Sequence, residues 1–467
     1  MNSEKWKVIH KPTDCGPWGG ATSRAARILA IAGICLLNTT ASFAGPEIPG
    51  APQQRPIALV GGTVHPVAGP TIASGTVVFD RGRIVAVGLD VPIPEDAERI
   101  DAAGLHVYPG LIDAHTQIGL LEIPSVRGSV DVAESGKLNP NVRAHVAVNP
   151  ESELIPVTRR NGVLTVLTAP SGRLVAGRSS LIMLDGWTND DMLLKADVAM
   201  HVTWPKIAPT HTWRLDDEHE GKLESRDATL RELRETLEDA RAYWTVQKAR
   251  RAKSQPAIER DIRWDALGPV LDGQMPLMVQ ADEVQQIQGA VSLAERMGLK
   301  LIIYGGYDAP ECADLLKQHH VSVIVAGVTR LPQRRHDPYD AAYTVPARLH
   351  AAGVTFCLAG VGRMGNTRNL PYQAGMAAAY GLPPDAALKA ITQWPAEILG
   401  VGDRIGSLVA GKDATLIVTT GDVLETPTRV TRAYIQGRAV DLTDRQTRLW
   451  TKYQEKYRRL REQDADK

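Results

Sequence analysis

Short apolar runs recur through the middle of this 467-residue chain and constrain its fold more than any other feature. Each run is apolar at successive positions, as in strands of parallel sheets that are covered on both faces. The runs are residues 162–168, 276–279, 300–304, 321–325 and 355–358. An amphipathic helix that ends at Gly298 lies between two of them, with the stripe Val284, Ile287, Val291 and Ala294. This alternation predicts an α/β fold, either a (β/α)8 barrel or a doubly wound parallel sheet.

Shorter strand candidates lie on both sides of this α/β region. Residues 57–60, 76–79 and 83–87 precede it, and Gly82 suits a tight hairpin turn after Asp80. Residues 413–419 and 432–440, which follow the α/β region, are also short strand candidates. Two β-rich flanks around an α/β middle predict one small β-sandwich that is assembled from both parts of the chain.

Two further helices are expected. One covers residues 222–251, and its stripe of Leu230, Leu233, Leu237, Ala240 and Trp244 favours packing on the outside of the α/β region. A lid over a pocket mouth is the alternative for this helix. A second helix near residues 444–462 begins at Thr443 or Asp444 and carries Leu449, Tyr453, Tyr457 and Leu460 on one side.

The N-terminal region is typical of a secretory signal peptide. Arg24 and Arg27 precede an apolar run at residues 28–37, and Ser42 and Ala44 are small residues at a cleavage position. The run is too short to span a bilayer, and a membrane anchor or a buried helix is the alternative. Cleavage after Ala44 predicts a periplasmic or secreted protein. Beyond this cleavage position the cysteines are Cys312 and Cys357, which are expected to be buried thiols.

Composition excludes some partners. The formal net charge is zero, with acidic and basic residues interspersed, so neither nucleic acid nor, after signal cleavage, a membrane is an expected partner. A Gly-x-Ser-x-Gly elbow, a Walker loop and a dinucleotide fingerprint are all absent from the sequence. A small-molecule substrate or ligand is the expected partner.

Several motifs resemble imidazolonepropionase-type amidohydrolases. At the beginning they are residues 61–64, 82–84 and 107–115; at the end they are residues 368–372, 395–400 and 405–414. The resemblance implies that residues 45–105, with a linker at 45–56, and residues 405–442 form the composite sandwich. It also implies a (β/α)8 barrel at residues 106–404, and the helix pattern described above gives a C-terminal helix at 443–467.

The resemblance implies hydrolysis of carbon–nitrogen bonds other than peptide bonds, with a divalent metal that activates water. Such enzymes take their ligands from a His-X-His strand, a later Lys or Glu, two further His and an Asp on the last strand. Here His115 matches the first position, but Gln117 stands at the second. Gln280 and Tyr307 also stand where relatives often have His, and residues 357–363 contain no Asp. The cofactor is therefore left open, and no metal ligand is assigned.

The candidate catalytic residues are His115, His201 and Asp308, and the candidate substrate-binding residues are Gln117, Gln280, Asp282, Tyr307 and Arg363. With Asp113, the carboxylates could join His115 in a rebuilt Mg or Mn site. The alternative is that Asp282 and Asp308 cap the following helices and that His201 is a hydrogen-bonded barrel histidine.

The sequence leaves two candidate functions open. The first is an exported hydrolase of non-peptide carbon–nitrogen bonds with a divergent, metal-poor site. The second is a non-catalytic relative that binds a small molecule or a protein partner in the periplasm.

Overall fold

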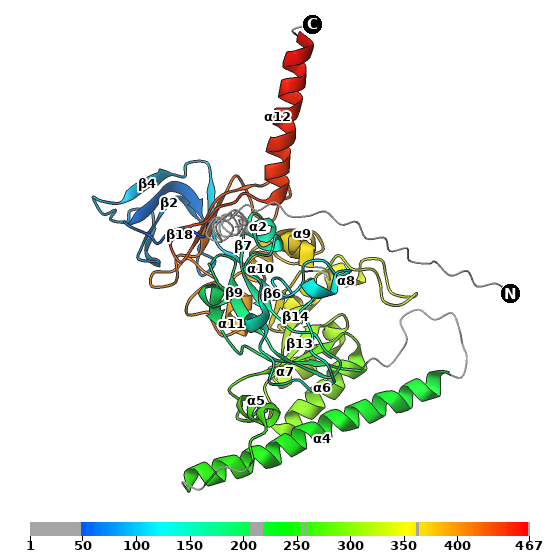
Figure 1. Cartoon of the computed structure of the whole chain (residues 1–467). Coiled ribbons are helices and arrows are strands. Elements are labelled where there is room, and N and C mark those ends of the chain that lie inside the picture. The colour runs from blue at the N-terminus through cyan, green and yellow to red at the C-terminus, as the bar shows by residue number, and fades with distance from the viewer. Residues whose placement is uncertain (1–47, 206–217, 254–255, 257–258, 361–363, 466–467) are drawn as a thin grey trace, which may run out of the picture. The chain divides into compact units, whose positions relative to one another are not determined.

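The computed structural model describes residues 48–205, 218–253, 256, 259–360 and 364–465 (Figure 1). The predicted signal peptide at residues 1–44 lies outside these described residues, as does Arg363. Within the described ranges, no helix is both long enough and apolar enough to cross a lipid bilayer.

Strands from both flanks form one mixed sheet of eight strands, in which blue and orange-red segments meet (Figure 1). Its order is β18-β17-β16-β5-β1-β2-β3, and β4 pairs with β1. The strands are β1 (Ile57–Val64), β2 (Ile72–Asp80), β3 (Arg83–Gly88), β4 (Glu98–Asp101), β5 (His106–Pro109), β16 (Leu416–Thr419), β17 (Val430–Ile435) and β18 (Arg438–Ala439). The antiparallel pairing of β5 with β16, with Pro109 opposite Leu416, joins the two flanks. Both flanks therefore contribute strands to a single composite sheet.

Side chains from both flanks share one hydrophobic core in this sheet. Leu59 and Phe79 from the first flank lie with Leu416 and Tyr434 from the second, and all four are at most 2% exposed. The Phe79 and Tyr434 rings meet edge to face, with their centroids 5.0 Å apart. Since neither flank contributes the whole core, each depends on the other for burial of its apolar face.

The middle of the chain forms a closed barrel rather than an open doubly wound sheet. Strands β6 and β7 pair in parallel, and β11, β12, β13, β14 and β15 form a second parallel series. Hydrogen bonds from Leu358 N to Ala390 O and from Ile112 N to Ile391 O link β15 back to β6. The strands are β6 (Leu111–Thr116), β7 (Val163–Thr168), β11 (Met200–Thr203), β12 (Leu277–Ala281), β13 (Leu301–Gly305), β14 (Ser322–Val325) and β15 (Phe356–Leu358).

One part of the barrel wall departs from a regular (β/α)8 pattern. Strands β8 (Val175–Arg178) and β9 (Ser180–Met183) follow each other with one residue between them. β9 pairs antiparallel with β7, and β8 pairs antiparallel with β11. This segment therefore bridges the two parallel series, with its direction reversed. The short strand β10 (Leu193–Lys195) extends the wall beside β9.

The described part of the chain also contains α-helices. They are α2 (Leu154–Arg159), α3 (Asn189–Met192), α4 (Glu218–Ala252), α5 (Ile262–Leu271), α6 (Val284–Met297), α7 (Ala313–Gln318), α8 (Ala341–Ala352), α9 (Leu370–Ala379), α10 (Pro384–Lys389), α11 (Gln393–Ile398) and α12 (Arg445–Ala465). Short 3-10 turns are η1 (Arg127–Ser129), η2 (Ala144–Ala147), η3 (Ala309–Cys312) and η4 (Met364–Asn369). The predicted stripe of α6 is buried at Ile287, Val291 and Ala294, and Gly298 ends the helix in the left-handed conformation.

Helix α4 uses its predicted stripe for packing. Leu233, Leu237 and Ala240 are fully buried. A Cβ at Gly268 of α5 would lie 2.7 Å from the Trp244 ring, so the two helices approach closely at this point. The Trp244 indole N–H also donates to Asp272 at the end of α5. The described part of α4 therefore packs on α5 and does not cover the mouth of the barrel as a lid.

Leu416→Ala tests whether the second flank holds the composite sheet together. Removing this buried side chain is expected to lower the free energy of unfolding by about 2–5 kcal/mol, because a cavity forms in the shared core. The matched control is Leu89→Ala, at a side chain that is 63% exposed, with an expected change below about 0.5 kcal/mol. Urea unfolding followed by circular dichroism measures both, and equal effects would contradict the shared core.

Candidate active site

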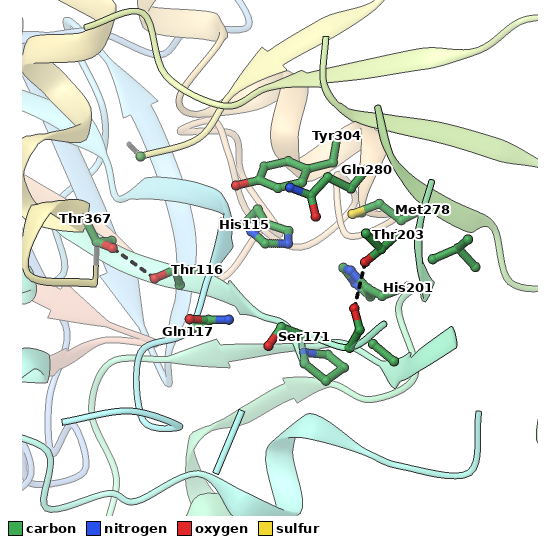
Figure 2. Close-up of a pocket in the computed structure, with 15 residues that line it drawn as sticks. His115, Thr116, Gln117, Ser171, His201, Thr203, Met278, Gln280, Tyr304 and Thr367 are labelled. Carbon is green, nitrogen blue, oxygen red and sulfur yellow. Dashed lines mark hydrogen bonds between the residues drawn. The ribbon is translucent and has the colours of Figure 1, made fainter. Parts of the chain in front are cut away.

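A cavity of about 390 Å³ lies at the C-terminal ends of the barrel strands. His115 reaches it from β6, His201 and Thr203 from β11, Gln280 from β12 and Tyr304 from β13; Gln117 lines it just after β6 (Figure 2). This is the end of an α/β barrel at which catalytic residues gather. Four of the candidates from the sequence therefore share one cavity: His115, Gln117, His201 and Gln280.

The two histidines are neighbours in this cavity. Their ring centroids lie 5.5 Å apart, and the Tyr304 ring stacks on His115 with its centroid 3.6 Å away. His201 is only 6% exposed, and its Nε2 atom has no hydrogen-bond partner among the described residues. The prediction that His201 is a hydrogen-bonded barrel histidine is therefore wrong for its Nε2 atom. A buried polar atom without a partner is unusual, and His201 is one of the residues that line the cavity.

Burial keeps both imidazoles uncharged. It lowers the pKa of His115 to about 4 and holds the pKa of His201 well below its ordinary value. The neighbouring His115 lowers the pKa of His201 further, because two adjacent cations would repel each other. Burial also raises the pKa of the Tyr304 phenol, so this group keeps its proton. At neutral pH the titratable side chains that line the cavity are neutral hydrogen-bonding groups.

The divalent metal implied by the resemblance does not fit these residues. A catalytic zinc site normally has three protein ligands from His, Cys or carboxylates, and Mg or Mn prefers carboxylate oxygens. Here the cavity offers two imidazoles and the neutral amides of Gln117 and Gln280. In the part of the chain that the structure describes, no group of three or more His, Cys, Asp and Glu side chains is arranged to hold a metal ion.

The carboxylates of the rebuilt-site hypothesis are engaged elsewhere. Asp308 forms an ion pair with Arg334 and accepts from the backbone N–H of Val284. It therefore caps α6, which precedes it, and not the helix that follows. Asp282 accepts from Arg330 at 3.1 Å. Neither carboxylate lines the cavity of His115 and His201. The structure thus brings the two histidines together and leaves the two aspartates in ion pairs.

Tyr307 also lies apart from the cavity lining. Its hydroxyl donates to Asp337 at 2.8 Å, and its backbone N–H donates to Asp282 at 3.2 Å. The guanidinium groups of Arg330 and Arg334 lie 5.5 and 6.0 Å from the centre of its ring. These contacts place Tyr307 in the ion-pair network beside the cavity and not in the lining itself.

Strand register points to pocket residues that the sequence did not single out. Gln280 of β12 pairs with Tyr304 of β13 on one side and with Thr203 of β11 on the other. Because neighbouring residues of parallel strands face the same side of the sheet, Gln280 could have indicated both. Ser171 joins the lining from the loop after β7 and had no comparable signal.

Asp113 ties the first strand of the barrel to the end of the last one. Its fully buried carboxylate accepts from the backbone N–H of His115 at 3.1 Å and from that of Gly360 at 3.2 Å. A Cβ at position 360 would lie 2.8 Å from the carboxylate, so glycine is required for this approach. Burial raises the pKa of Asp113 to about 7, and the two N–H donors oppose the rise only in part.

Asp113→Asn is expected to change how stability depends on pH. The folded-state pKa lies above the unfolded value, so the cost of ionising Asp113 is absent below about pH 4 and fully present above about pH 7. The stability of the wild type relative to the variant should therefore fall by up to roughly 4 kcal/mol over this range. Urea unfolding at a series of pH values measures this difference.

The same series includes a surface control. Asp90→Asn changes the same chemical group at an exposed position and is expected to leave the pH profile of the wild type unchanged. His115 and His201 have lowered pKa values and therefore make stability rise with pH, which is opposite to the effect of Asp113. Because wild type and variant share both histidines, this contribution cancels in the difference between them. A difference for Asp113→Asn that does not change with pH would contradict the buried-carboxyl account.

Comparisons with known proteins agree with this architecture. Residues 193–440 match the amidohydrolase family. The chain is 26% identical over 372 residues to an imidazolonepropionase from Aromatoleum aromaticum, which covers 74% of this chain and 85% of that protein. It is 24% identical over 401 residues to amidohydrolase tasK from Hapsidospora irregularis, covering 78% of this chain but only 40% of that protein.

Solved structures share the fold. An amidohydrolase from Thermotoga maritima MSB8 superposes with a TM-score of 0.74 at 25% identity, over 82% of this chain and 99% of that one. A molinate hydrolase superposes with a TM-score of 0.52 at 16% identity, over 85% and 96% of the two chains, and shares the fold alone. Since the family match spans more than half of its residues, this chain belongs to the amidohydrolase family.

Proposed function

We propose that the protein hydrolyses a non-peptide carbon–nitrogen bond in a small, uncharged molecule without a divalent metal. Membership of the amidohydrolase family supports the reaction class. The unpartnered Nε2 of His201, buried at the edge of the cavity beside a second neutral imidazole, carries the proposal. A charged ligand would lose its hydration there without meeting an opposite charge among the described lining residues.

The cavity offers a neutral set of groups for this reaction. Hydrolysis requires a base for the attacking water, donors to the carbonyl oxygen and a proton for the leaving nitrogen. The neutral imidazole of His201 accepts the water proton as oxygen bonds to the carbonyl carbon. Amide N–H groups of Gln117 or Gln280 donate to the carbonyl oxygen. As the carbon–nitrogen bond breaks, the proton held by His201 passes to the nitrogen.

Binding without hydrolysis is the second candidate function. It is favoured by the low pKa of the histidines, because an imidazole that resists protonation is a weak general base. A non-catalytic relative would use the same side chains to orient a neutral ligand. The two candidates therefore share the pocket and differ in whether a product forms.

His201→Gln separates the two candidates. If the hydrolase proposal holds, kcat falls at least about 100-fold while KM changes little, because a general base contributes mainly in the transition state. His145→Gln is the matched control, since His145 is also buried but bonds to Ser180 and does not line the cavity. A panel of neutral cyclic and linear amides is screened by chromatography for product and by calorimetry for binding.

The outcomes are distinct. Binding without product would overturn hydrolysis and favour the second candidate. Near-stoichiometric metal in the purified protein, together with activity that a chelator removes, would overturn the metal-free site. The pH profile adds a check: protonation of the imidazoles should not lower kcat/KM between pH 8 and about pH 5, because burial keeps both neutral. A change within this range would instead report on Asp113, whose pKa is about 7.

We also propose that the protein is exported and cleaved after Ala44. The arginines and the apolar run before this position support the proposal. N-terminal sequencing of the protein recovered from a periplasmic extract or from the medium should begin at Gly45. An intact N-terminus on the extracted protein would contradict cleavage.

A further inference from the structure

Helix α12 carries an apolar stripe that the described part of the chain leaves uncovered. Its five members are between 41% and 61% exposed: Leu449, Trp450, Tyr453, Tyr457 and Leu460. The beginning of the helix is fixed, because Asp444 accepts from the N–H of Thr447 and Arg448 pairs with Glu153. The stripe begins directly after this attachment and runs along the red helix of Figure 1.

Charges around α12 are segregated. At 3.6 residues per turn, Lys452, Lys456 and Arg459 follow one border of the stripe and Arg461 lies on the other. The ammonium group of Lys456 lies about 6 Å from the rings of both Tyr453 and Tyr457. The stripe is therefore bordered by positive charge.

The acidic groups of α12 are placed differently. Glu455 and Glu462 lie on the face opposite the stripe, where both pair with Arg458. Asp464 lies at the far end of the helix, beyond the last apolar residue of the stripe. The full helix carries seven basic and three acidic residues, so basic residues exceed acidic ones even though Glu455 also pairs with Arg459 of the border.

A second copy of this chain is a poor match for the stripe. Helix pairs favour aliphatic residues at their contact positions and opposite charges along the borders. Two copies of α12 would bring the same lysines and arginines together, and like charges oppose association. Tyrosine and tryptophan instead combine an apolar ring with a polar tip, which suits the boundary between lipid and water.

We propose that α12 binds the surface of an anionic lipid bilayer and lies in the plane of the headgroups. The aromatic stripe enters the interface, and the bordering lysines and arginines pair with lipid phosphates. The net charge of zero predicted that no membrane is a partner. A net charge summed over the whole sequence does not show how charges are distributed on a single helix such as α12. The proposal does not depend on the chemistry of the His115 and His201 cavity.

Sedimentation with vesicles of phosphatidylcholine, with and without phosphatidylglycerol, tests the proposal on the full chain. Binding is expected with the anionic vesicles, and added salt should weaken it. Lys456→Gln should lower the affinity about fivefold. Arg458→Gln removes the same charge from the opposite face and is the matched control, with unchanged affinity expected. Trp450→Ser should weaken binding without loss of helix content.

Each result has a defined meaning. Because all variants carry the same N-terminal segment, differences among them report on α12. Equal effects of Lys456→Gln and Arg458→Gln, equal binding to neutral and anionic vesicles, or no vesicle binding would each overturn the proposal. So would a dimer in sedimentation velocity that Tyr453→Ser dissociates in the absence of vesicle binding, since a second copy would then cover the stripe.

Discussion

The carboxylate of Asp113 holds the first and last strands of the barrel together, and the position of the cavity depends on it. It accepts from the backbone of His115 on one side and of Gly360 on the other. The first contact fixes the backbone from which the His115 ring extends, and Tyr304 and His201 are placed against that ring. A buried carboxyl without a cationic partner is unfavourable, so two N–H donors and a glycine neighbour are needed to accommodate it.

The cavity contrasts with the polar network beside it. Asp282 and Asp308 are charged groups whose partners are Arg330 and Arg334, so their charge is compensated locally. The cavity itself keeps only neutral groups among its described lining residues. The replacements at Gln117 and Gln280 are consistent with this arrangement, because an amide donates and accepts hydrogen bonds without carrying charge. The site is therefore chemically different from the metal centre that the family motif first implies.

Much of the fold could be predicted because its signals are local. The runs that became β7, β12, β13, β14 and β15 are apolar on both faces, and the stripe of α6 ends at a glycine. The reversed segment β8–β9 could not be predicted in this way, because strand direction is decided by distant partners. The same limit applies to Asp282 and Asp308. Their arginine partners follow a different strand, and only the folded barrel brings them together.

The pairing of β5 with β16 has a consequence for how the protein folds. Pro109 lies opposite Leu416, so the sheet cannot be completed until the barrel region between them has been synthesised. Pairing over such a long separation closes a large loop and slows folding. Until β16 arrives, one edge of β5 presents unpaired backbone groups that could pair with another chain. During the interval between synthesis of the two flanks, this uncovered edge therefore exposes the chain to aggregation.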